Sequence, residues 1–130
     1  MAKYKFSKSS RLTSKTDFRT ILARKFFAKS SLMTLYIAPN SFAKRRFAVS
    51  VSSKIAPACG RNRLKRLARE AFRLSQNELA DGFDYLVIYS AMLSKRSCSD
   101  IKKIALSEVK QSFIELARQT LERFEKRQNK

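Results

Sequence analysis

The stretch Arg61–Arg73 constrains the fold of this chain more than any other, because it predicts a helix with two very different faces. Its sequence is RNRLKRLAREAFR, in which six of thirteen side chains are Arg or Lys and only Glu70 is acidic. The uncharged residues recur at the spacing of one helical face; they are Leu64, Leu67, Ala68, Ala71 and Phe72. The apolar face must pack on a core, while the other face presents a row of cations about 20 Å long.

This row is the first candidate site. Its members are Arg61, Asn62, Arg63, Lys65, Arg66, Arg69 and Arg73. A solvated helix face usually mixes acids with bases, so the excess of cations favours a polyanionic partner, and arginine suits bidentate contacts with phosphate. A merely solvated face is the alternative. Arg63 and Glu70 lie one heptad apart on the polar edge, where they could pair.

The charge of the whole chain points the same way. Its 130 residues, the size of one domain, carry a net charge of +19. Residues 1–75 hold 19 Lys or Arg against 2 Asp or Glu, whereas residues 76–130 hold 10 against 8. No apolar run approaches the ~18 residues of a membrane span, and MAKYKFSKSSR lacks the apolar core of a signal peptide. We therefore expect a cytoplasmic protein with a nucleic-acid partner and no membrane partner.

The residues that catalysis or metal binding would need are scarce. The chain has no histidine, so no catalytic triad or imidazole base is possible. Cys59 and Cys98 are too few for a structural zinc site, and we expect plain thiols, as in most cytosolic proteins. The ten carboxylates are scattered rather than clustered as a two-metal nuclease requires. We predict no catalytic residue and no metal site on this chain.

Periodicity and turn signals predict the elements around the basic helix. The expected segments are a flexible basic N-terminus at 1–10, a helix over 15–26, strands at Leu32–Ala38, Arg46–Ser53 and Phe83–Ser90, a turn at Asp81-Gly82, a long helix from Ser99-Asp100 to about 125, and a frayed tail at 126–130. The first two strands are expected to pair as an antiparallel hairpin. The third is a nearly continuous apolar run, which is typical of a strand buried on both faces.

One face of the predicted sheet is unusually polar for a core. It carries Thr34, Tyr36, Ser50 and Ser52, opposite the apolar Phe47 and Val49. Hydroxyls around an aromatic ring suit a floor for single-stranded RNA, because bases stack on aromatic side chains. An ordinary half-exposed sheet face is the alternative.

The basic helix also carries a family signature. The Arg61-Asn62-Arg63 core, followed by Lys65-Arg66 and Arg69-Glu70 and ending Ala71-Phe72-Arg73, resembles the bacterial ribonuclease P protein subunit, and the resemblance extends over roughly residues 9–120. It implies one α+β domain of the ribosomal protein S5 domain 2-like fold. The implied element order is αβββαβα, around a sheet of about four strands, with a left-handed βαβ crossover and one short strand that the sequence pattern does not reveal.

The resemblance further implies two RNA-binding surfaces. The basic helix would grip the catalytic RNA, and a cleft between the first helix and the sheet would bind the 5′ leader of precursor tRNA. The implied leader-binding residues are Phe18, Leu22, Thr34, Tyr36, Ser50, Ser52 and Lys54, and the other basic RNA contacts are Arg11, Lys15, Arg45 and Arg46. Leu22 stands where the family often has an aromatic residue, and Ala56-Pro57 where it usually has Gly-Asn.

The expected function is therefore that of a protein component of the ribonuclease P endoribonuclease, which removes the leader to give the mature tRNA 5′ end. Catalysis would reside in the RNA, which would also hold most of the Mg²⁺. The expected partners are the catalytic RNA and precursor tRNA, with no obligate protein partner. A ribosome-associated or general RNA-binding module is the alternative. A DNA-binding protein is a third reading, although nothing resembles a helix-turn-helix or a basic zipper.

Overall fold

The computed structural model describes residues 15–24, 26–40, 45–52, 58–90, 93 and 101–128, with side chains omitted at 15–18, 58 and 59. The elements are α1 (Lys15–Arg24), β1 (Phe26–Lys29), β2 (Met33–Pro39), β3 (Arg46–Ser50), α2 (Ala58–Ser75), the short 3₁₀ helix η2 (Gln76–Glu78), β4 (Phe83–Tyr89) and α4 (Leu106–Gln128). The predicted α+β class and the order αβββαβα are confirmed. The predicted turn before β4 is present, and Gly82 adopts the positive φ (79°) that glycine tolerates best.

The four strands form one mixed sheet in the order β1-β2-β4-β3. β4 pairs antiparallel with β2 on one side and parallel with β3 on the other. The antiparallel hairpin that was predicted between Leu32–Ala38 and Arg46–Ser53 is therefore wrong, because β4 lies between the corresponding strands β2 and β3. The apolar run of β4 gains most from an interior position, where both of its faces are covered, and Tyr85, Leu86 and Val87 are all buried.

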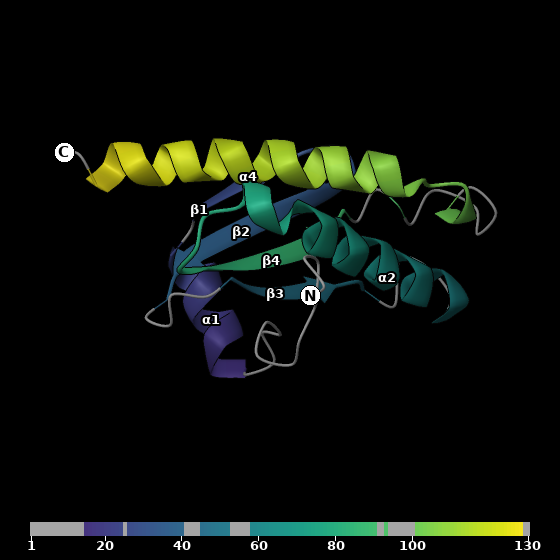
Figure 1. Ribbon diagram of the computed structural model, residues 1–130. Coiled ribbons are helices and arrows are strands. Elements are labelled where there is room, and N and C mark those ends of the chain that lie inside the picture. The colour runs from purple at the N-terminus through teal and green to yellow at the C-terminus, as the bar shows by residue number, and fades with distance from the viewer. Residues whose placement is uncertain are drawn as a thin grey trace, which may run out of the picture.

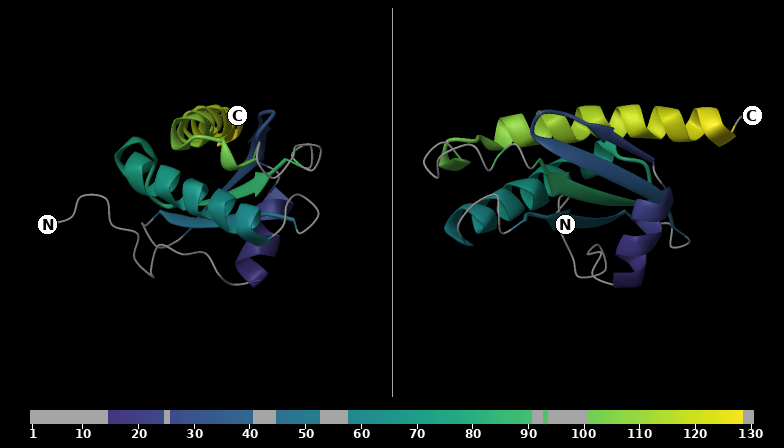
Figure 2. Two further views of the ribbon diagram at one scale, coloured as in Figure 1. Left: turned by 90° about the vertical axis from the view of Figure 1, so that its right-hand side faces the viewer. Right: turned by 180° about the vertical axis from the view of Figure 1, so that it is seen from behind.

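The connection from β3 through α2 to β4 is a left-handed crossover, as the family resemblance implied. In Figure 1 the parallel strands β3 and β4 both run from left to right, and β4 lies above β3. The chain leaves β3, passes through α2 in front of the sheet and then enters β4. The side view in Figure 2 places α2 and α4 on one side of the sheet and α1 on the other. The described part of the chain thus has three layers, and α1 is the only described helix in the third.

The main core lies between the sheet and the pair α2 and α4. Phe47 of β3 stacks on Phe72 of α2 with ring centroids 4.8 Å apart, and Phe113 of α4 packs edge-on against Phe47 at 5.9 Å. The Tyr89 hydroxyl donates to the Leu64 carbonyl at 2.7 Å, which ties β4 to α2. The predicted apolar face of α2 is confirmed, and α2 is held rigidly with its cationic side outward.

The opposite sheet face has a much smaller core. Ile21 of α1 is fully buried against Ala38, Ala48 and Leu86, with Tyr36 packed at the margin. α1 contacts β2 and β4. Because this helix is short, it covers only part of the face. Among the described residues of the remaining part, Ser50 is exposed, and Thr34, Tyr36 and Ile88 are half-buried.

The first helix ends earlier than predicted. α1 stops at Arg24, and Phe26 begins β1, the strand that the sequence pattern did not reveal. Phe26 matches the helical period of Ile21 and Leu22, so the period alone extended the helix too far. In the structure the Phe26 ring lies on the α4 side instead, 5.1 Å from the ring of Phe124.

The last helix begins later than predicted, at Leu106 rather than near Asp100, and it continues through Gln128. Ile101 and Ile104 are buried as the pattern required, but they belong to a separate turn in which the Ile104 amide donates to the Ile101 carbonyl at 3.1 Å. The Ile104 carbonyl accepts from Arg63 Nη2 at 2.9 Å. That carbonyl is therefore committed to a tertiary contact rather than to the helix.

Candidate nucleic-acid interface

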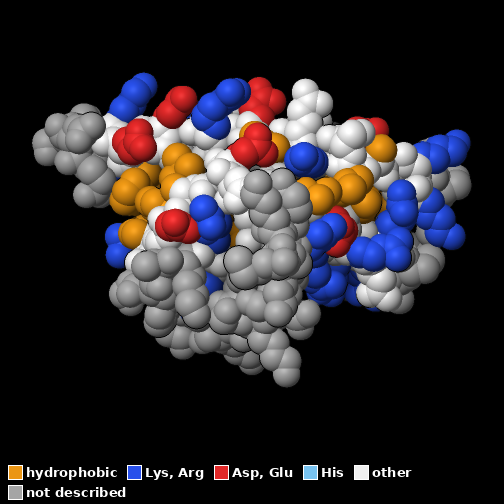
Figure 3. Space-filling model, viewed as in Figure 1, with side chains coloured by type: hydrophobic (Ala, Val, Ile, Leu, Met, Phe, Trp, Pro, Cys, Tyr) orange, Lys and Arg blue, Asp and Glu red, His pale blue; other side chains and the backbone are white. Residues whose placement is uncertain are grey.

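The outer face of α2 is a strongly cationic surface. Asn62, Arg66 and Arg69 are exposed, and Arg61 and Lys65 are half-buried. Figure 3 shows Lys and Arg side chains gathered over this helix, on the right of the view. A shallow depression on this face is lined by Asn62, Arg63, Lys65, Arg66 and Arg69. The arrangement offers several donors to an anion at successive turns of one rigid helix.

Two predicted members of the row have partners within the protein. Arg63 reaches the Ile104 carbonyl and has a buried Nε. Arg73 pairs with Glu70, with Nη2 2.7 Å from Oε2 and Nε 3.1 Å from Oε1. Glu70 therefore pairs with Arg73 and not with Arg63, the partner that the heptad spacing had made possible. Hydrogen bonds from Arg73 lower the pKa of the Glu70 carboxyl, although its desolvation acts in the opposite direction.

The sheet face that α1 leaves open is the second candidate surface. The strand register places Thr34, Ile88 and Ser50 side by side across β2, β4 and β3. The next row holds Tyr36, which is half-buried. Ser52 is exposed just beyond β3. The structure thus brings Thr34, Tyr36 and Ser50 onto one face of the sheet.

The unpredicted strand β1 adds residues that the sequence reasoning missed. Phe27 pairs in register with Tyr36, and Lys29 with Thr34. The Phe27 and Tyr36 ring centroids are 5.2 Å apart, and Lys29 Nζ lies 5.9 Å from the Phe27 centroid. A second aromatic ring and a cation therefore extend the open face to the sheet edge. The spacing of Phe27 and Lys29, two residues apart, was the only sign of a strand in the sequence. Four residues are too few for this spacing to distinguish a strand from the end of a helix.

The two arginines before and at the start of β3 have structural partners. Arg46 forms a bidentate pair with Asp84, with Nε–Oδ1 and Nη2–Oδ2 both 2.7 Å, and the side chains are only 15% and 8% exposed. Asn40 Nδ2 donates to the same Asp84 Oδ1 at 2.8 Å. Arg45 donates to the Leu79 carbonyl and pairs with the exposed Asp81. This geometry gives Arg46 a role in the fold, because its pair with Asp84 joins β3 to β4.

Several predicted site residues lie outside the described part of the chain. They are Arg11 and Lys54, together with the side chains of Lys15 and Phe18. The segment 1–10, which was expected to be flexible, the Ala56-Pro57 departure, Cys98 and the Cys59 side chain also fall there. Leu22, by contrast, is described and is 40% exposed on α1. An aliphatic side chain is thus exposed at the position where the family resemblance led us to look for an aromatic residue.

Comparison with known proteins identifies the family. The family model for ribonuclease P matches residues 6–120. The chain belongs to the ribonuclease P protein family. Among curated ribonuclease P protein components, that of Vibrio cholerae is 34% identical over 102 residues, covering 78% of this chain and 81% of the relative. That of Dictyoglomus turgidum is 33% identical over 117 residues, covering 89% and 92%.

Solved structures support the same assignment. The ribonuclease P protein of Thermotoga maritima superposes with a TM-score of 0.73 at 26% identity, covering 84% of this chain and 96% of that one. The Staphylococcus aureus protein gives a TM-score of 0.64 at 25% identity, with coverages of 78% and 93%. The S5 domain 2-like fold that the resemblance implied is thus confirmed.

Family membership establishes the general role. The chain is the protein component of the ribonuclease P endoribonuclease, a ribonucleoprotein that processes the 5′ end of tRNA, and its partner is the ribonuclease P RNA. Among the described residues, no helix is long and apolar enough to cross a membrane. The same residues contain no group of three or more His, Cys, Asp or Glu placed to hold a metal ion.

Proposed function

We propose that the two surfaces divide the work of the subunit, with α2 binding the catalytic RNA and the open sheet face binding the 5′ leader of precursor tRNA. The observation that carries this proposal is their different chemistry. α2 presents exposed cations such as Arg66 and Arg69, which suit the phosphates and shape of a folded RNA. The sheet face presents Tyr36, Phe27 and hydroxyl groups, which suit unpaired bases.

We propose further that the RNA performs the catalysis and holds the Mg²⁺ ions. The chain has no histidine, and its described carboxylates are engaged in ion pairs or scattered over the surface. Metal ions at a cleavage site can stabilise both the attacking and the leaving oxygens of the phosphodiester. The protein would lower the demand for Mg²⁺ by adding its own cations close to the phosphates. This role requires no protein partner, and precursor tRNA in the cytoplasm is the substrate that we propose.

The test is cleavage of precursor tRNA at low Mg²⁺ by a bacterial ribonuclease P RNA, with and without this protein. We expect stimulation, with a product that ends at the mature 5′ end. Tight RNA binding without stimulation would contradict the proposed role in leader removal and favour a general RNA-binding module. A control chain with three α4 cations removed, Lys110, Arg118 and Lys126, should stimulate as well as the wild type.

Replacing Tyr36 with alanine should weaken binding of leader-bearing precursor by roughly 5- to 150-fold, because stacking on an aromatic side chain contributes about 1–3 kcal/mol per base. Binding of mature tRNA should not change. Tyr36→Phe is the matched control, since it keeps the ring beside Phe27 and removes only the hydroxyl. The measurement is the dissociation constant of the holoenzyme for both RNAs, and equal losses on both would argue against the sheet face as the leader site.

A further inference from the structure

A depression lies at the edge of the sheet, where β1 meets the C-terminal part of α4. It has a volume of about 260 Å³ and is lined by Phe26, Phe27, Arg123 and Arg127. Phe26 and Phe27 are consecutive residues of a strand, so their side chains lie on opposite faces of the sheet. The depression therefore opens at the boundary between the α4 side and the open sheet face.

Two guanidinium groups form one wall of this depression. Arg123 Nη1 donates to the Phe27 carbonyl at 2.6 Å, and the Arg127 guanidinium lies 5.3 Å from the Phe26 ring centroid. Both side chains are exposed. Within the described ranges, neither has a carboxylate within ion-pair distance, although Glu122 and Glu125 are neighbours in sequence. Their charge is therefore available to an external anion.

The depression continues the aromatic floor of the open sheet face. Phe27 belongs to both, because its ring contacts Tyr36 on the sheet while the residue also lines the depression. Lys29 lies beyond Phe27 on the same face of β1. A strand of RNA that crosses the sheet from β3 to β1 thus meets rings first and then three cations at the edge. This order suits a backbone that leaves the floor and turns over the rim.

We propose that Arg123 and Arg127 bind phosphates of the distal part of the 5′ leader, beyond the nucleotides held on the sheet face. This inference rests on the proposed function of that face. It makes a specific addition: the protein should distinguish long leaders from short ones through the end of α4. The contact is electrostatic and independent of sequence, because guanidinium groups read phosphate and not base edges.

The test compares holoenzyme binding of precursors with a short leader and with a leader several nucleotides longer, over a range of salt concentrations. Arg123→Gln/Arg127→Gln should weaken long-leader binding by about tenfold. It should also reduce the steepness of the salt dependence by about 1.4, since each phosphate on a single strand contributes about 0.7. Short-leader binding should not change. Arg127→Gln alone keeps the Arg123 hydrogen bond to β1 and should give about half the change in slope.

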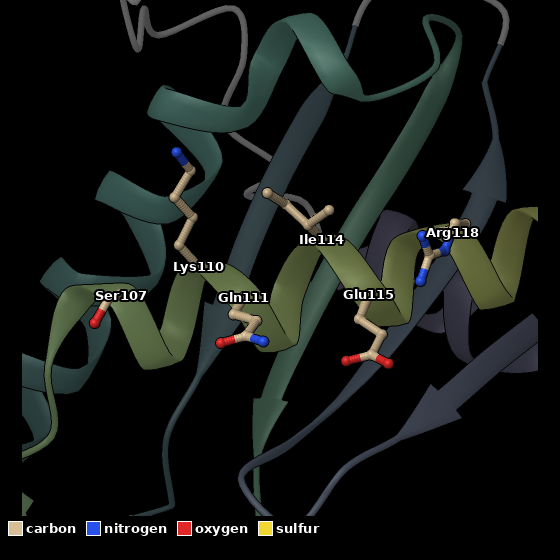
Figure 4. A pocket seen from close by; sticks show the side chains of 6 residues that line it. All are labelled: Ser107, Lys110, Gln111, Ile114, Glu115 and Arg118. Atoms are coloured by element: carbon tan, nitrogen blue, oxygen red, sulfur yellow. The ribbon is translucent and has the colours of Figure 1, made fainter.

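The matched control is Lys110→Gln/Arg118→Gln, which removes the same charge from another part of α4. These side chains line a separate depression together with Glu115 and Ile114 (Figure 4). An equal loss from the control pair, or a loss shared by both leader lengths, would overturn the proposal. If the wild type bound both leaders and mature tRNA equally, the proposed function would fail as well. If Tyr36→Ala weakened leader binding but the Arg123/Arg127 change did not, only the present inference would fail.

Discussion

Replacing Asp84 with alanine is expected to lower the free energy of unfolding by about 3–5 kcal/mol, because it removes the buried carboxylate that neutralises the largely buried guanidinium of Arg46. The Asp84 side chain is 8% exposed, and it accepts three hydrogen bonds, two from Arg46 and one from Asn40. The pair joins the start of β3 to β4, where the two strands run parallel in register. The measurement is chemical denaturation of the full chain.

The adjacent residue Arg45 supplies an internal control. Its partner Asp81 has a side chain that is 64% exposed, with Oδ1 2.9 Å from Arg45 Nη1. Because the pair is exposed, Asp81→Ala should lower the free energy of unfolding by no more than about 1 kcal/mol. The double change Arg46→Met/Asp84→Leu should cost less than the sum of the single changes, because it removes both charges together. Equal costs for Asp84→Ala and Asp81→Ala would show that the buried pair contributes no more than a surface pair.

Replacing Arg61, Arg66 and Arg69 with glutamine should weaken binding to the catalytic RNA on the order of 100-fold at moderate salt, assuming about 1 kcal/mol for each contact. The logarithm of the affinity should also depend less steeply on salt, by roughly 2 to 3, because each phosphate contact releases about one counterion. Arg63 is excluded from this variant, because its bond to the Ile104 carbonyl ties α2 to the segment before α4.

The matched control removes three cations from α4 instead: Lys110→Gln, Arg118→Gln and Lys126→Gln. It has the same net charge, so a non-specific effect of charge would weaken both variants equally. Filter binding or fluorescence titration over a salt series gives both quantities. An unchanged salt slope in the α2 variant would remove this helix from the RNA interface, whatever the effect on tRNA processing.

Arg63 shows what the sequence pattern could not reveal. Glu70, which lies one heptad away on the same helix, pairs with Arg73 instead. Helical periodicity places side chains on faces, but it does not reveal which acceptor from another element will reach them. The Ile104 carbonyl comes from a segment 41 residues further along the chain. The same limit applies to Arg46, whose partner Asp84 lies 38 residues away.

Local pattern also failed where an element was short. Phe26 fits the helical period of α1, and the four residues of β1 are too few for an alternating pattern to stand out. As a result Phe27, the ring beside Tyr36, did not enter the predicted site. The antiparallel hairpin was predicted because neighbouring strands usually pair, yet the more apolar β4 takes the position between β2 and β3.

The sequence by itself determined the two faces of α2, the burial of β4 and the family signature, and the family resemblance in turn implied the α+β class and the order of the elements. These follow from composition, periodicity and a local motif, each carried by residues close together in the chain. Only the tertiary structure decided the strand order, the partners of Arg46 and Arg63, and the place of Phe27, Arg123 and Arg127 at one sheet edge. Those contacts join segments that are distant in the sequence. Several strand and side-chain pairings are locally possible, and which of them forms depends on how the whole chain packs its core.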